Sequence, residues 1–280
     1  MYGRWTENTY LMVFDYIFVA LKSIGVIGNL LICFFFIKIN WGKLKTMSCY
    51  HFLLILLAIV DLENCVLVLL LDFSFTSMER YVFIIIENVN FVFQCHSIYV
   101  LLLVSVSRYR TICYPFKTRW NKRKYFSMFL LTLLVSFLHA LDFLYYGIHT
   151  VDQLVLILTP CVKIFPCSML CFHYYKISKT LKESEESQAK KRNEKAKKTL
   201  KYLVIIYVVS TIPVEIFLIC QVLLKTYEVV YDQSTLDHVA LATLNITYFN
   251  NICNVFIYMY MMPEFRRFIF NLICFRCRNA

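Results

Sequence analysis

Glycine and proline are scarce in this sequence, with five residues of each among 280. The chain has no glycine-rich loop that could cradle a phosphate group, no H-E-x-x-H zinc motif and no nucleophile elbow. Its six histidines do not fall at metal-ligand spacing. These absences leave little support for catalysis, and we expect a protein that is not an enzyme.

Apolar residues, in contrast, make up 60% of the chain, which is too much for one water-soluble core. A helix that crosses the roughly 30 Å of a bilayer's hydrocarbon needs about 20 mostly apolar residues. Seven such runs occur, and they lack the polar-apolar alternation of barrel strands. The sequence therefore predicts an all-α membrane protein with a seven-transmembrane helix bundle. The predicted spans are residues 10–37, 48–73, 81–106, 125–147, 151–175, 200–224 and 236–260.

Basic residues predict the orientation of these spans. Segments 38–45, 108–124, 176–201 and 266–278 hold 24 of the 29 Lys and Arg residues, and all four lie on one side of a seven-span bundle. By the positive-inside rule, this side is cytoplasmic. We expect a multi-pass plasma-membrane protein with an extracellular N-terminus and a cytoplasmic C-terminus. Because apolar spans separate the basic segments, we expect no nucleic-acid partner.

Arg108, Tyr109, Ile112 and Pro115 form the pattern R-Y-x-x-I-x-x-P at the cytoplasmic end of the third span. This pattern resembles the rhodopsin-like (class A) family of G-protein-coupled receptors. The other spans carry residues similar to further motifs of that family. They are Gly28-Asn29, Leu57 to Asp61, Pro166 with Tyr174, Pro213, Asn254 to Tyr258, and Phe265 in a short eighth helix.

The chain also departs from the family pattern. Ser107 stands where an acid precedes the arginine, Thr211 replaces an aromatic residue, and Val255 replaces the proline of N-P-x-x-Y. All 12 cysteines fall in spans or on the cytoplasmic side, so no extracellular disulfide is expected. These losses resemble the divergent invertebrate chemosensory branches of the superfamily.

The resemblance divides the chain into three parts. Residues 1–9 are an extracellular tail, 10–262 the seven-transmembrane receptor domain, and 263–280 an amphipathic eighth helix with a short cytoplasmic tail. Within the receptor domain, the charged cytoplasmic loop at about 176–199 has helix-forming residues throughout, and we expect the flanking spans to continue into it as helices. This loop is either a basic linker that faces lipid or a surface that docks a partner.

The resemblance also implies the function. It predicts a receptor that binds an extracellular small molecule or peptide and activates a heterotrimeric G protein, with Pro166 and Pro213 as helix pivots. The residues it assigns to coupling and switching are Arg108, Tyr109, Ile112, Pro115, Tyr174, Asn254 and Tyr258.

Asp61 is a functional candidate because an ionisable residue in mid-membrane costs about 2.5 to 3.5 kcal/mol. With Asn29, Ser97, Asn250 and Asn254 it forms a polar cluster like the family's sodium site. The cluster is either such a sodium site or a water-filled hydrogen-bond network. We expect no other cofactor.

Lys163 and Glu215 are predicted to pair where the fifth and sixth spans meet. One hypothesis is that they line or gate a ligand pocket together with Asn90, Gln94 and Tyr248. The alternative is a structural tie between helices.

Cys274 and Cys277 lie between basic and apolar residues after the last span, which favours palmitoylation over plain free thiols. The remaining tail offers no partners for a zinc or redox site.

Two other classes of protein remain open. A channel or transporter would show a repeated half or broken helices at matched positions, and neither is evident. A receptor-like protein that binds a partner without signalling is compatible with the replaced residues Ser107, Thr211 and Val255.

Overall fold

The computed structural model of the chain describes residues 9–41, 47–74, 80–116, 120–148, 153–183, 188–227 and 233–278. These residues form α-helices joined by short connections, and no strand occurs among them. The helices are α1 (Thr9–Ile39), α2 (Cys49–Ser74), α3 (Arg80–Cys113), α4 (Lys122–Ile148), α5 (Gln153–Glu183), α6 (Gln188–Thr226), α7 (Gln233–Met261) and α8 (Pro263–Arg278).

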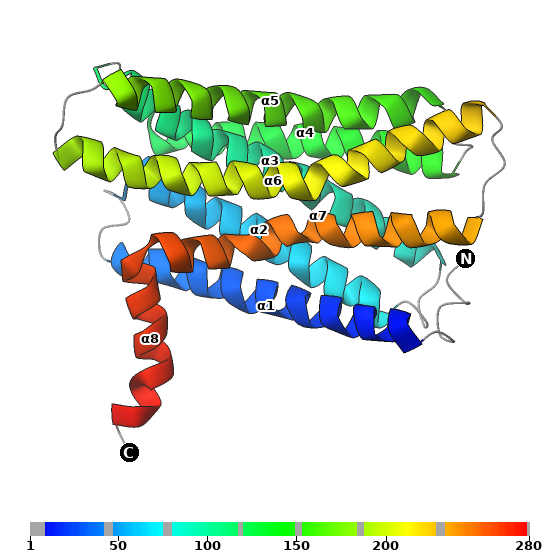
Figure 1. Ribbon diagram of the computed structural model, residues 1–280, viewed down its shortest axis with the longest axis horizontal. Helices are drawn as coiled ribbons and strands as arrows, with labels where there is room; N and C mark the ends of the chain where they lie inside the picture. The colour runs from blue at the N-terminus through cyan, green and yellow to red at the C-terminus, as the bar shows by residue number, and fades with distance from the viewer. Residues whose placement is uncertain are drawn as a thin grey trace.

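The helices α1 to α7 run side by side along the long axis of the molecule, and α8 runs crosswise from one end (Figure 1). The helix α3 is central, since it packs against α2, α4, α5 and α6. The helix α7 closes the arrangement by packing against α1, α2 and α6. Residues on α3 can therefore meet side chains from most of the other helices.

Among the described residues, four helices contain a segment long and apolar enough to cross a membrane, which makes the fold compatible with a multi-pass membrane protein. These segments agree with the first, second, third and sixth predicted spans. The spans predicted at 125–147, 151–175 and 236–260 correspond to α4, α5 and α7. Some side chains in these three helices are not described. Their membrane crossing stays a prediction. The four segments are Tyr16–Ile39, Cys49–Asp72, Ile84–Cys113 and Lys197–Gln221.

The outer surface of α6 is apolar, and its inner surface mixes core hydrophobics such as Leu203 and Tyr207 with polar residues. Large aliphatic side chains three or four residues apart form an exposed stripe, while Ser210, Thr211 and Glu215 are buried. This arrangement is the reverse of a water-soluble helix and suits hydrocarbon surroundings. The exposed stripe consists of Ile205, Val209, Ile212, Ile216, Ile219 and Leu223.

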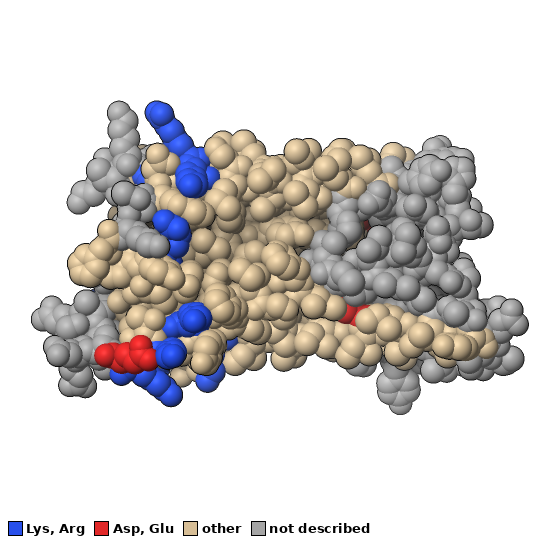
Figure 2. Space-filling view, turned by 90° about the horizontal axis from the view of Figure 1, so that it is seen from above, with Lys and Arg blue, Asp and Glu red and all other residues tan. Residues whose placement is uncertain are grey.

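Lys and Arg side chains gather at one end of the molecule, which we call the basic end (Figure 2). Lys38, Arg110 and Lys182 occupy the last turns of α1, α3 and α5, and α4 begins with Lys122. The predicted loop between α5 and α6 is largely helical, since α5 continues to Glu183 and α6 begins at Gln188. Residues 184–187 lie outside the described part.

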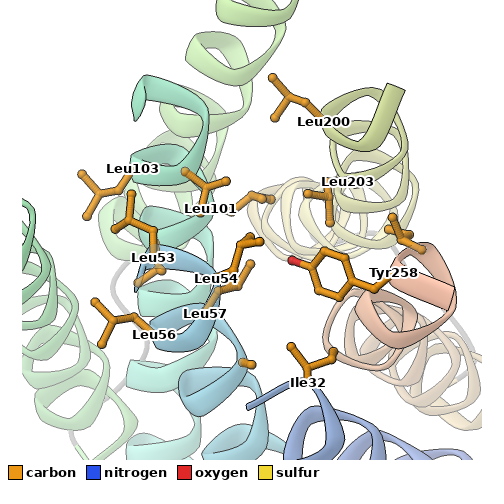
Figure 3. Close-up of a cluster of buried hydrophobic side chains, with 14 of the residues drawn as sticks. Ile32, Leu53, Leu54, Leu56, Leu57, Leu101, Leu103, Leu200, Leu203 and Tyr258 are labelled. Atoms are coloured by element: carbon orange, nitrogen blue, oxygen red, sulfur yellow. The ribbon is translucent and has the colours of Figure 1, made fainter. Parts of the chain in front are cut away.

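Buried hydrophobic residues from all eight helices form one core cluster, to which α4 contributes Tyr125. In Figure 3, the ring of Tyr258 lies within this cluster and its hydroxyl points toward the leucines of α2 and α3. The helix α7 ends next to this cluster, because Pro263 cannot donate the backbone hydrogen bond that would continue the helix. The new helix α8 then packs Phe265 against Phe35 of α1, with ring centroids 5.1 Å apart.

Candidate functional site

Asp61 lies at the middle of a polar cluster that joins three helices. Its carboxylate is fully buried on α2. The Ser97 hydroxyl of α3 donates to Oδ1 at 2.5 Å, and the Asn254 amide of α7 donates to Oδ2. Both carboxylate oxygens are thus satisfied by protein donors, which offsets much of the cost of burying a charge.

Asn29 extends this cluster to α1. Its Nδ2 donates to the backbone oxygens of Gly25 and Asn251, each at 3.0 Å. This contact is possible because α1 approaches α7 closely at Gly28, where an added Cβ would overlap the side chain of Val255. The valine that replaces the expected proline therefore fills the space left by this glycine.

The structure does not bring every predicted member into the cluster. Asn250 is half-buried, and no hydrogen bond among the described residues joins it to Asp61. Its neighbour Asn251 is buried and supplies the carbonyl that Asn29 binds. This contact uses the backbone of Asn251, so the predicted role of the Asn250 side chain stays a prediction.

A sodium ion at Asp61 would use oxygen ligands from Asp61, Ser97 and Asn29, whose Oδ1 is buried without a hydrogen-bond partner. The observed contacts place one donor on each carboxylate oxygen, and the choice between a sodium ion and a hydrogen-bond network stays a prediction. Among the described residues, no group of three or more His, Cys, Asp or Glu side chains could hold a metal.

Arg108 lies near the basic end of α3 and faces an aromatic ring. Its guanidinium carbon is 3.2 Å from the ring centroid of Tyr50 on α2, well inside the range of a cation–π contact. Its Nε is buried without a hydrogen-bond partner. The preceding Ser107 is buried. Where the family that this chain resembles has an acid–arginine pair, this chain has a buried serine and an arginine that faces Tyr50.

Three further coupling candidates are Tyr109, Ile112 and Tyr258. Tyr109 stacks on His173 of α5, with centroids 4.8 Å apart, and His173 Nδ1 is 2.9 Å from the Ser105 hydroxyl. Ile112 is buried in the core, and Tyr258 is buried with a hydroxyl that has no hydrogen-bond partner. These contacts tie α3 to α5 near the basic end.

The remaining coupling candidates lie nearer the surface. Pro115 is exposed beyond α3, whereas Tyr174 is half-buried on α5. Sequence analysis overlooked Phe116, which follows Pro115 and is fully exposed at 101%. A large apolar ring with no cover, beside the basic end, is a candidate contact for a partner protein. Its place directly after the R-Y-x-x-I-x-x-P pattern was the available signal.

Lys163 of α5 and Glu215 of α6 form the predicted ion pair, with 2.8 Å between Nζ and Oε1. Their side chains are 7% and 6% exposed. The contact is ionic only, because neither carboxylate oxygen has a hydrogen bond of good geometry. The Lys163 ammonium also lies 5.5 Å from the ring centroid of Phe91 on α3. The pair therefore lies in the interior where α3, α5 and α6 meet.

Asn90 and Tyr248 form a second outer group on a different side of α3. The Asn90 amide donates to the Tyr248 hydroxyl of α7 at 3.2 Å. Asn90 faces α7 while the next residue, Phe91, faces α5 and α6, as expected for neighbours about 100° apart on a helix. Gln94 is half-buried one turn along. The five predicted pocket residues thus divide between two neighbouring groups.

Lys22 and Asp72 extend the second group and were overlooked by sequence analysis. The Lys22 ammonium of α1 is 2.8 Å from Asp72 Oδ2 of α2 and 5.2 Å from the ring centroid of Tyr248. Both are ionisable residues inside apolar runs, so the same signal that singled out Asp61 was available for them.

The predicted pivots lie inside helices. Pro213 interrupts the backbone ladder of α6 two residues before Glu215, and Pro166 lies in α5 three residues after Lys163. The candidate lipidation residue Cys274 is an exposed free thiol on α8. The side chain of Cys277 lies outside the described residues.

No model of a known protein family matches this chain, and no curated protein matches it. The functional argument therefore rests on the motifs and on the contacts that join them.

Proposed function

We propose that this protein is a seven-transmembrane receptor of the rhodopsin-like kind, which binds an extracellular ligand and activates a heterotrimeric G protein at the basic end. The observation that carries the proposal is the meeting of Asp61, Ser97 and Asn254. These residues come from three separate helices that carry motifs. Ser97 and Asn254 lie 36 and 193 positions after Asp61 in the sequence. Motif residues that are far apart in the chain share one buried network, as the switch core of such a receptor would require.

In this proposal, a ligand acts in the outer half at Lys163 and Glu215 and the neighbouring Asn90 and Tyr248. It shifts α6 about Pro213 and opens a cleft beside Arg108 for a segment of the G protein. The ligand can favour the open state only by its differential affinity for the two states. The ligand class is a small molecule or a peptide, and a chemosensory role follows from the resemblance alone.

Nucleotide exchange tests the proposal. The purified receptor in lipid nanodiscs is mixed with each of a panel of heterotrimeric G proteins, and basal GTPγS uptake is measured for wild type and Arg108→Ala. Arg123→Ala is the matched control, because Arg123 is an exposed arginine at the start of α4. We expect exchange with at least one G protein that Arg108→Ala abolishes and Arg123→Ala preserves.

The proposal fails if no G protein responds or if the two variants behave alike. Ion current across a bilayer that persists without any G protein would favour a channel instead. Binding of a partner protein without exchange would favour a non-signalling receptor-like protein.

A further inference from the structure

The partner of Arg108 is the feature of this chain that the family resemblance leaves unexplained. Ser107 occupies the position of the expected acid, and its buried hydroxyl carries no charge that could pair with the guanidinium. No ion pair within the described ranges 9–41, 47–74, 80–116, 120–148, 153–183, 188–227 and 233–278 involves Arg108.

The nearby acids are either occupied or distant from the core. Asp61 accepts hydrogen bonds from Ser97 and Asn254, and Glu194 pairs with Lys197 at 3.1 Å within α6. Glu183 and Glu264 are exposed at the end of α5 and the start of α8. A carboxylate restraint on Arg108 is therefore lacking in the described part of the chain.

Arg108 contacts the ring of Tyr50 instead of a carboxylate. The 3.2 Å separation between the guanidinium carbon and the ring centroid puts the cation directly against the face of the ring. The hydroxyl of Tyr50 takes part in none of the described hydrogen bonds, so the aromatic face is what holds the arginine. Both residues are half-buried, which strengthens the attraction relative to an exposed pair.

We propose that Tyr50 is the positioning residue that restrains Arg108 in the resting state, through a cation–π contact between α2 and α3. The strength of this contact sets the basal population of the open state. This inference rests on the proposed function, because the arginine is taken as the group that the G protein meets. The restraint on Arg108 can also be tested on the free receptor, without a G protein.

The first experiment varies the ring face while keeping its shape. Position 50 is replaced in the full chain by phenylalanine, 3,5-difluorophenylalanine and 3,4,5-trifluorophenylalanine, since each fluorine withdraws electron density from the ring face. Basal GTPγS uptake should match wild type for phenylalanine and rise stepwise with fluorine number. Because cation–π contacts contribute about 0.5 to 2 kcal/mol, complete loss should raise uptake about 2- to 30-fold. Uptake that is independent of fluorine number overturns the proposal, since a steric role would give that result.

The second experiment measures the receptor without a G protein. A trifluoromethyl-phenylalanine replaces the exposed Lys201 on α6, and ¹⁹F NMR reports the population of the open state. Tyr50→Leu should raise this population and Tyr50→Phe should leave it unchanged. Phe52→Leu is the matched control, because its ring lies on the same helix and packs against Phe126 of α4, 6.5 Å between centroids.

The outcomes separate the two proposals. If Tyr50→Leu shifts the population but no G protein responds to any variant, the restraint stands and the proposed function fails. If exchange depends on Arg108 but Tyr50→Leu and Phe52→Leu give equal populations, the proposed function stands and the restraint is wrong.

Discussion

The buried pair Lys163–Glu215 gives the sharpest stability prediction. Both side chains are more than nine-tenths buried, so replacing Lys163 by methionine leaves a buried carboxylate with no counter-ion. Removing one partner of a buried pair costs about 3 to 5 kcal/mol, whereas replacing both by apolar residues of similar volume is neutral or stabilises by about 1 to 4 kcal/mol. We therefore expect Lys163→Met to be strongly destabilising and Lys163→Met with Glu215→Met to recover the loss.

The same chain supplies a control pair. Lys197 and Glu194 lie three residues apart on α6, with side chains 18% and 34% exposed. Ion pairs three or four residues apart on helix surfaces contribute about 0.2 to 0.5 kcal/mol. The two pairs thus contain the same chemical groups and differ mainly in burial and sequence separation.

The assay is a double-mutant cycle on the full chain in detergent, with the free energy of unfolding measured by dodecyl sulfate titration. The coupling energy for Lys163 and Glu215 should exceed that for Lys197 and Glu194 by at least about 2 kcal/mol, from the difference between the buried and surface ranges. Equal coupling energies would refute the reasoning, because burial would then add nothing to the interaction. A destabilised double variant would show that the pair is needed for more than mutual neutralisation.

Three further predictions concern other parts of the molecule. Gly28→Ala should destabilise the protein by about 1 to 3 kcal/mol, because the new methyl group overlaps Val255. Adding Val255→Ala should reduce that loss. Thermal unfolding of both variants measures the two changes in stability. Replacing sodium by choline should leave the unfolding temperature of wild type unchanged, since protein donors satisfy Asp61; a sodium-dependent rise that Asp61→Ala removes would establish the ion instead. Phe116→Ala should lower GTPγS uptake at least tenfold with unchanged unfolding, because the ring is fully exposed; equal uptake would exclude Phe116 from partner binding.

Sequence patterns were sufficient for features that depend on local composition. The four apolar segments found among the described residues, the helical continuation of α5 and α6 and the basic end all follow from runs of similar residues. Asp61 was found because a carboxylate within an apolar run requires a partner, and the structure supplies Ser97 and Asn254.

Sequence patterns were insufficient where helix rotation decides the contact. Asn250 and Asn251 precede Asn254 by four and three residues, so both can lie on its face of α7. The close approach of α1 at Gly28 and Val255 selects the rotation that places the Asn251 carbonyl against Asn29. The contact between Tyr50 and Arg108 was hidden for a similar reason, because 20 tyrosines and 25 phenylalanines offer many rings and only tertiary packing chooses one.

In the proposed receptor, an aromatic contact in place of an acid–arginine pair changes how much free energy a ligand must supply to favour the open state. A cation–π contact of about 0.5 to 2 kcal/mol is offset by a differential affinity of about 2- to 30-fold for the open state. Converting a population of 1:99 to 99:1 requires about 10⁴-fold, so this contact supplies only a minor part of the full barrier between the states. In the proposed receptor, the larger part comes from the packing of α6, which includes Tyr207. This residue is buried and donates to the backbone oxygen of Lys163 at 3.3 Å. A ligand that displaces Lys163 would disturb the ion pair with Glu215 and this hydrogen bond together, on either side of Pro213. The proposed receptor should therefore respond to outer-half ligands chiefly through α5 and α6, with Tyr50 setting the basal level.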